Sequence, residues 1–344
     1  MKNPFALLLL LAAGSLSAQE AAPPSAPPPP ELTAEERLQA LDAEQIEAAI
    51  EALRTKHIEA EAIDEPAVRR ATLRGLLEGL QPGAELAGVA PEATAAVPFF
   101  SEILGERTGY IRPGSPGTEN IARLDAALQE FRGKKVDAVV LDLRAAPDGG
   151  DFEIAAQFAG RFAPAAAPLF VLSGETDKNF TAAGPRAFDG VVAVLVDADT
   201  AGAAEAIAAS LRVHAKAMLV GAQTSGRAVE FDEVDLGDGQ RLRWAAAEVR
   251  VESLPAIYPG GLEPDLAVEQ DAATRDAIFA AMPEKGAAAF VFQTEREQLN
   301  EAALVAGTNP EISAGEESGA ALVDRPLQSA VDLVTAIRLF GGRN

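Results

Sequence analysis

Cysteine is absent from all 344 residues, which excludes disulfide bonds, thiol chemistry and a lipid-anchored amino-terminal cysteine. Histidine occurs only at His57 and His214, and no spacing of acidic or histidine residues is typical of a metal site. No phosphate-binding loop is present either, because the glycine-bounded stretch at 221–226 lacks a following lysine. We therefore predict no metal and no cofactor.

Basic residues are also scarce. Lys and Arg number 29 against 52 Asp and Glu, which gives a formal net charge of −23. Such an acidic surface repels phosphate backbones and anionic membranes, so nucleic acid is excluded as an expected partner. With 48% hydrophobic residues the chain can still bury a large core, and its length allows one large domain or two medium ones.

The amino-terminal apolar run, Phe5–Ala13, is too short to span a bilayer as a stable anchor. With Lys2 before it and small residues after it, the run is typical of a secretory signal peptide over residues 1–18, cut after Ser17 or Ala18. This predicts a periplasmic or secreted protein with no stable membrane insertion after cleavage. The alternative is a retained amino-terminal anchor.

Composition divides the rest of the chain into parts. Residues 19–31 are proline-rich and predict an extended linker, with recognition by a polyproline-binding domain as an alternative use. Residues 32–86 predict a helical leader, because capping boxes precede apolar residues at helical spacing. Residues 271–344 predict a mostly helical extension, which ends in an amphipathic helix opened by Asp324.

Strands and helices alternate over residues 106–270. Short apolar runs predict buried strands at 136–143, 194–196 and 218–220. A helical pattern between the last two predicts a strand–helix–strand unit, so we expect an α/β domain with parallel strands. Its functional loops would follow the carboxyl ends of the strands, at 197–202 and 222–227. Residues 85–101 and 173–190 carry little pattern and are expected to be loops.

Six segments of the chain occur in the order typical of one enzyme family. They are RRATLRGLLEGLQPG, TGYIR, VVLDLRAAPDGG, VAVLVDADTAGAAEAI, AMLVGAQTSGRAV and GGLEPDL. On these segments the chain resembles the C-terminal processing peptidases, also called tail-specific proteases. The resemblance implies a crotonase-like α/β core and a serine-type peptidase that cuts peptide bonds with a serine–lysine dyad.

The resemblance also implies where that dyad would lie, and both positions carry other residues. Gly202 stands at the nucleophile position and Arg227 at the position of the general base, with the separation that the family uses. Glycine has no hydroxyl to form an acyl-enzyme, and arginine, whose pKa lies above about 12, stays protonated and accepts no proton. Either change alone is expected to abolish the dyad.

Other site positions follow from the same resemblance. The N–H of Ala203 and the turn at Gly149 and Gly150 are expected to supply the oxyanion donors. Asp148 stands where the family passes directly from proline to glycine, and its carboxylate would repel a developing oxyanion. Arg144 and Glu205 are expected to support the site.

The family's peptide-binding PDZ module has no room between Gly83 and Gly109, because it needs on the order of 80–100 residues. We therefore favour a pseudopeptidase that binds a peptide or a protein partner in the old catalytic cleft. Two alternatives stay open. One is an active serine-type endopeptidase with a relocated nucleophile, Ser225 or Thr200, and the other is an unrelated binding protein on the same fold.

Overall fold

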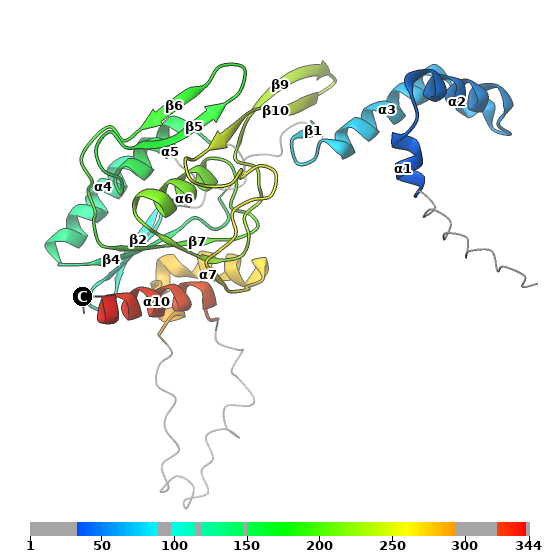
Figure 1. Cartoon of the computed structure of the whole chain (residues 1–344). Helices are drawn as coiled ribbons and strands as arrows, with labels where there is room; N and C mark the ends of the chain where they lie inside the picture. The colour runs from blue at the N-terminus through cyan, green and yellow to red at the C-terminus, as the bar shows by residue number, and fades with distance from the viewer. Residues whose placement is uncertain (1–32, 89–97, 115–117, 147–149, 293–321, 342–344) are drawn as a thin grey trace, which may run out of the picture. The chain divides into compact units, whose positions relative to one another are not determined.

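The computed structural model describes residues 33–88, 98–114, 118–146, 150–292 and 322–341 (Figure 1). The chain divides into two compact units, residues 1–71 and 72–344, and each is described by itself. The predicted signal peptide and linker, together with Asp148 and Gly149, lie outside the described residues. Within the described ranges, no helix is both long enough and apolar enough to cross a membrane.

Helices make up the described part of the first unit. Thr33 and Asp42 each form a capping box with the residue three positions on, which confirms both predicted helix starts. The elements are α1 (Ala34–Gln39), α2 (Ala43–Lys56), the 3₁₀ turn η1 (Ala60–Ala62) and α3 (Glu65–Gly79), which continues into the second unit. No residue of these helices is buried, so these helices add no side chain to the hydrophobic core.

A six-stranded sheet in the order β11–β8–β7–β4–β3–β2 organises the second unit. Its strands are β2 (Phe100–Leu104), β3 (Thr108–Arg112), β4 (Ala138–Asp142), β7 (Val191–Val196), β8 (Met218–Gly221) and β11 (Leu266–Ala267). Neighbouring strands are parallel except β2 and β3. Because β7 and β8 pair in parallel across α6 (Ala203–His214), the predicted strand–helix–strand unit is confirmed.

Both faces of this sheet are covered. Val139 and Val194 belong to a core shared with α4 (Thr118–Gly133), α5 (Phe152–Gly160) and α6. Val140 and Leu195, one residue along each strand, belong to a second core with α7 (Ala272–Lys285), η2 (Ala288–Phe290) and α10 (Arg325–Gly341). In Figure 1, α7 and α10 lie on the opposite side of the sheet from α6. Strands that are buried on both faces have continuous apolar sequences, as the sequences of these strands do. The predicted α/β class is confirmed.

A five-stranded antiparallel sheet lies beyond α5 and α6. Its order is β1–β10–β5–β6, with β9 also paired to β10. The strands are β1 (Ala84–Ala87), β5 (Pro168–Ser173), β6 (Lys178–Thr181), β9 (Val229–Gly237) and β10 (Gln240–Arg250). β9 and β10 form the predicted hairpin, in which Asp238 and Gly239 both have positive φ.

Three short strands overlap stretches that were expected to be loops, so the expectation was wrong at those residues. β1 overlaps the start of residues 85–101 and β2 overlaps their end, whereas β6 lies wholly within residues 173–190. Each is four or five residues long and pairs with a strand elsewhere in the chain. Such short strands depend on packing against their neighbours and leave little local pattern.

Candidate functional site

Three loops that follow parallel strands meet at one edge of the six-stranded sheet. They follow β4, β7 and β8; the described residues of the first are 143–146 and 150–151, and the other two are residues 197–202 and 222–227. The N–H of Ala145 donates to Asp197 Oδ1 at 3.2 Å, and the N–H of Ser225 donates to Thr200 O at 3.1 Å. The carboxyl ends of parallel strands are where open α/β sheets bind ligands, so this edge is the candidate site.

Gly202 forms the sharp turn between β7 and α6. Its backbone has φ 56° and ψ −122°, and it is the N-cap of α6 without a side-chain cap. Residues with a Cβ rarely adopt this conformation. A strained strand-to-helix turn holds the serine of α/β-hydrolases, where it exposes the hydroxyl to substrate. Here the same kind of turn presents no reacting atom.

Ala203 and Gly150 lie against each other beside this turn. A Cβ added to Gly150 would stand 2.9 Å from the Cβ of Ala203. Gly150 has φ 90°, so two conditions favour glycine there. Ala203 is the first residue of α6, and the first amides of a helix have no intrahelical acceptor. The predicted donor and the end of the predicted glycine turn are therefore adjacent.

Glu205 connects α6 to the loop after β8. Its side chain is fully buried, and the carboxylate accepts hydrogen bonds from Thr224 Oγ1 at 2.5 Å and from the Gly226 N–H at 2.8 Å. Burial raises the pKa of Glu205, and hydrogen bonds from Thr224, Gly226 and the backbones of Arg227 and Gly202 offset part of that rise. The backbones of Gly202 and Arg227, the two predicted dyad positions, thus both lie at the Glu205 carboxylate.

The loop after β8 is also fixed from its other side. Thr224 accepts a hydrogen bond on Oγ1 from the Leu262 N–H at 2.7 Å, and its own N–H donates to Leu262 O at 3.1 Å. A Cβ on Gly226 would lie 2.0 Å from Pro259 O, and Gly226 has φ 71°. Both the close approach and the positive φ therefore favour glycine at this position.

Arg227 points from this loop to the five-stranded sheet. Its NH2 lies 3.3 Å from Glu85 Oε1, and the same oxygen lies 2.7 Å from Arg243 NH1. Both guanidinium groups lie over the ring of Phe231, at 5.0 Å and 4.6 Å from its centroid. Sequence reasoning missed Glu85, Phe231 and Arg243. Only the alternation of charge and aromatic residues along the hairpin could have suggested the last two.

Arg144 makes a buried ion cluster beneath the site. Its guanidinium binds Asp142 and Asp324 in a bidentate manner, with N–O distances between 2.7 and 2.9 Å, and Tyr110 donates to Asp142 at 2.7 Å. Burial would raise the pKa of Asp142, but the charge and hydrogen bonds of Arg144 and the Tyr110 hydroxyl lower it overall. Because Asp324 precedes α10, Arg144 links that helix to the end of β4.

The two alternative nucleophiles differ in access. Thr200 is 0% exposed, and its Oγ1 lies 3.0 Å from Leu143 O and 3.1 Å from Asp197 Oδ1. Its hydroxyl therefore fixes the loop. Ser225 is part-buried, with its Oγ 3.4 Å from Glu205 Oε2. Both hydroxyls have carboxylates as their nearest basic groups.

A hollow of about 330 Å³ opens next to Gly150. Its walls come from the start of α5, from β5 and β6, and from the β9–β10 hairpin; they include Phe152, Lys178, Phe231 and Arg243. Lys178 is paired with Glu230 at 3.1 Å. Among the described residues, no group of three or more His, Asp or Glu side chains is arranged to hold a metal ion.

Comparison with known families finds a match over the α/β core. The sequence model of peptidase family S41 matches residues 107–268. A carboxyl-terminal-processing protease of Synechocystis sp. is 30% identical over 167 residues, which is 48% of this chain and 39% of the relative. The carboxy-terminal processing protease CtpB of Bacillus subtilis is 25% identical over 178 residues, or 50% of this chain and 36% of the relative. The chain thus spans about two-fifths of the length of these curated relatives.

Solved structures with a similar arrangement were also found. The photosystem II D1 C-terminal processing protease has a TM-score of 0.43 and 22% identity, covering 60% of this chain and 53% of that chain. A lipoprotein from Streptococcus agalactiae has a TM-score of 0.41 and 17% identity, covering 72% of this chain and 85% of that chain.

Proposed function

Because residues 107–268 form a domain of peptidase family S41, we propose that this tail-specific-protease-like protein binds polypeptide in the old catalytic cleft without cutting it. The observation that carries the proposal is the turn at Gly202. It has the backbone geometry that presents a nucleophile, and it has no side chain. A covalent acyl-enzyme needs an oxygen or sulfur atom at that point.

The base position supports the same conclusion. A serine–lysine dyad needs an amine that gives up its proton, whereas a guanidinium stays charged at all physiological pH values. Arg227 is also engaged elsewhere, since it contacts Glu85 and the ring of Phe231. The side chain at the base position therefore stabilises the junction between the β8 loop and the five-stranded sheet.

The other features of the site are suited to binding a polypeptide. The Ala203 amide at the start of α6 is a hydrogen-bond donor for a peptide carbonyl. The hollow beside Gly150 has apolar walls from Phe152 and Phe231 and charged groups at its rim. Pockets that combine apolar walls with a few oriented polar groups are typical binding sites.

An assay of binding and hydrolysis with the same probe tests the proposal. Purified protein is incubated with fluorescein-labelled β-casein, an unstructured polypeptide. We expect an increase in anisotropy, no new fragments by mass spectrometry and no labelling by a fluorophosphonate. Fragments that appear with the purified protein and persist after further purification would refute the pseudopeptidase assignment.

A pair of double variants tests the two positions. Gly202→Ser with Arg227→Lys restores both groups of the dyad and is expected to gain fluorophosphonate labelling. Gly202→Ala with Arg227→Lys carries the same lysine and a Cβ without a hydroxyl, so it should stay unlabelled. Equal labelling of the two variants, or none in a correctly folded first variant, would contradict the assignment of Gly202 as the nucleophile position.

The relocated-nucleophile alternative has its own test. Ser225 is the more exposed of the two candidates, and it lies 3.4 Å from a buried carboxylate. Hydrolysis of β-casein that disappears in Ser225→Ala and survives in Ser210→Ala would support that alternative. Ser210 is a suitable control because its buried hydroxyl bonds to Ala206 O within α6.

We also propose that the protein acts in the periplasm or outside the cell. Support comes from Lys2, the apolar run Phe5–Ala13 and the small residues that follow it. Expression in a Gram-negative host followed by amino-terminal sequencing is expected to give a chain that starts at Ala18 or Gln19. Recovery of the chain with Met1 in the membrane fraction would instead show a retained anchor.

A further inference from the structure

We infer that the free edge of β6 binds an extended basic peptide, which adds to the sheet as a further strand and runs toward the hollow beside Gly150. This inference rests on the proposed peptide-binding function and adds where the peptide lies and which chemistry selects it. Three observations carry it: an edge strand, a continuous groove along that strand and an unbalanced carboxylate in the groove.

The edge comes from the sheet order. β6 pairs with β5 and with no other strand among the described residues. In an antiparallel pair, alternate residues direct their N–H and C=O groups to the neighbour, and the others direct them outward. In the described part of the chain, no strand pairs with the outward-facing backbone groups of residues 178–181. Such an edge is a template for another strand, and peptides that bind this way gain their affinity from backbone hydrogen bonds.

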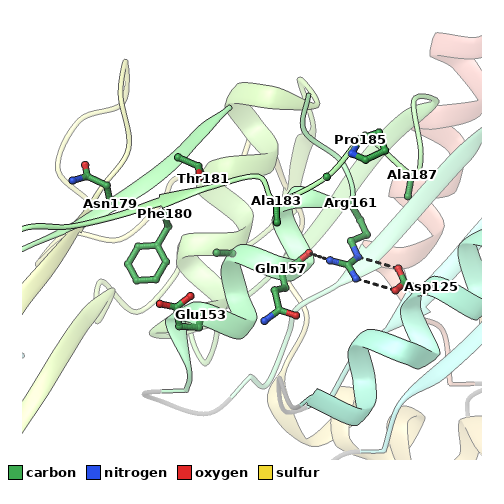
Figure 2. Close-up of a pocket in the computed structure, with 13 residues that line it drawn as sticks. Asp125, Glu153, Gln157, Arg161, Asn179, Phe180, Thr181, Ala183, Pro185 and Ala187 are labelled. Carbon is green, nitrogen blue, oxygen red and sulfur yellow. Dashed lines mark hydrogen bonds and ion pairs between the residues drawn. The ribbon is translucent and has the colours of Figure 1, made fainter. Parts of the chain in front are cut away.

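The groove follows the same strand. A second hollow, of about 630 Å³, lies between α5 and the segment 179–187 and extends to Asp125 on α4. Figure 2 shows Phe180 of β6 projecting toward Glu153 of α5 at one end and the paired Arg161 and Asp125 at the other. Glu153 and Phe180 also line the hollow beside Gly150. The two hollows therefore share a wall, and a strand added to β6 would pass along both.

Charge selects the peptide. The cations that line the hollows each have a carboxylate partner: Arg161 binds Asp125 at 2.9 Å, Lys178 binds Glu230 at 3.1 Å and Arg243 binds Glu85 at 2.7 Å. The exposed Glu153 has no cation within ion-pair distance among the described residues. It stands where the two hollows meet, in a chain of net charge −23. A Lys or Arg side chain of the peptide is the complement of this carboxylate.

Strand geometry determines which side chains of the peptide face the groove. The Phe180 ring stacks on Phe170 with centroids 4.6 Å apart, so its position is fixed by the core beneath it. Successive side chains of a strand point to opposite faces. A peptide that alternates an aliphatic and a basic residue would therefore carry all its basic side chains on one face and all its aliphatic side chains on the other, so that its basic face can meet Glu153 on α5.

The probes are fluorescein-labelled octapeptides of alternating lysine and valine, or of alternating glutamate and valine. Anisotropy titration of the full-length protein is expected to show binding of the lysine peptide and weaker binding of the glutamate peptide. Glu153→Lys should weaken the lysine peptide by about fivefold or more, because an attraction becomes a repulsion. Glu130→Lys, the same change at an exposed position of α4 outside both hollows, should leave it unchanged.

Backbone methylation tests the strand geometry. Two lysine–valine peptides are made, one N-methylated at every valine and one at every lysine. Only alternate N–H groups of an added strand face β6, so one isomer should bind about tenfold more weakly and the other within about twofold of the parent. Equal effects in both isomers, no binding of the parent, or identical behaviour of Glu153→Lys and Glu130→Lys would each overturn the inference.

The two proposals fail in different ways. Hydrolysis of β-casein refutes the pseudopeptidase but leaves the methylation pattern and the Glu153 effect in place. If β-casein binds, but octapeptide binding depends neither on Glu153 nor on backbone methylation, only the inference about β6 is refuted.

Discussion

Substituting alanine for Gly202 measures the strain that position 202 imposes on a side chain. The residue has φ 56° and ψ −122°, and a Cβ held in such a conformation costs about 1–3 kcal/mol. Alanine also restricts the unfolded chain, which favours folding by about 0.4–1 kcal/mol. With mid-range values of about 2 and about 0.7 kcal/mol, the difference predicts that Gly202→Ala lowers the free energy of unfolding by about 1–2 kcal/mol. Gly202→Ser should behave in the same way, because the strain acts at the Cβ.

Calorimetry and urea unfolding measure this cost. For a unit of this size, the loss corresponds to a decrease in Tm of about 2–8 °C. The matched control is Gly133→Ala at the end of α4, where an added Cβ meets nothing within 4 Å. Alanine there should leave stability unchanged or raise it by up to about 1 kcal/mol. If Gly202→Ala is as stable as the parent while Gly133→Ala behaves as expected, the strain assigned to position 202 is absent.

Three further substitutions address the surroundings of the site. Gly226→Ala should lower the free energy of unfolding by about 3 kcal/mol or more in urea titration, because the new Cβ would stand 2.0 Å from Pro259 O at a positive φ; stability near that of the parent would contradict the tight packing. Asp324→Asn should lower it by about 3–5 kcal/mol, since Arg144 loses one of its two buried carboxylates, whereas Asp332→Asn on the exposed side of α10 should change little. Glu205→Gln should remove a pH dependence of the free energy of unfolding. The folded-state pKa of Glu205 is raised, so the stability that Glu205 contributes is fully present below about pH 4.5. That contribution is lost as the pH rises through the folded-state pKa. Urea unfolding at stepped pH should show that loss in the parent and a flatter profile in Glu205→Gln, and identical profiles would refute the shift.

The parallel core was predictable because its signals are local. The apolar runs of β4, β7 and β8 and the helical stripe of α6 lie in short windows of sequence, and alternation of strands and helices leaves few topologies. The loops at the carboxyl ends of β7 and β8 follow from that topology. At Glu205 the two loops meet, because the backbones of Gly202 and Arg227 both bond to its carboxylate.

The partners of the site residues were not predictable in the same way. Glu85, which binds Arg227, lies on a four-residue strand that exists through its pairing with β10, and its bond to Arg243 joins residues 158 positions apart. The bond between Arg144 and Asp324 spans 180 positions. No periodicity reports contacts at such separations. A carboxylate in a featureless stretch gives no sign of which arginine it will meet.

The hydrogen bonds around Glu205 are needed to bury its carboxylate, whether or not the site is catalytic. A buried carboxylate is costly unless several donors surround it, and here Thr224 and the Gly226 N–H are among those donors. These bonds fix the loop that continues into β9, and Val229, Glu230 and Phe231 of β9 form one wall of the hollow beside Gly150. A binding cleft therefore needs this network as much as a catalytic one does. The presence of this network therefore does not distinguish a binding cleft from a catalytic one. The residue types at positions 202 and 227 do distinguish them, because they determine whether the site has a nucleophile and a base.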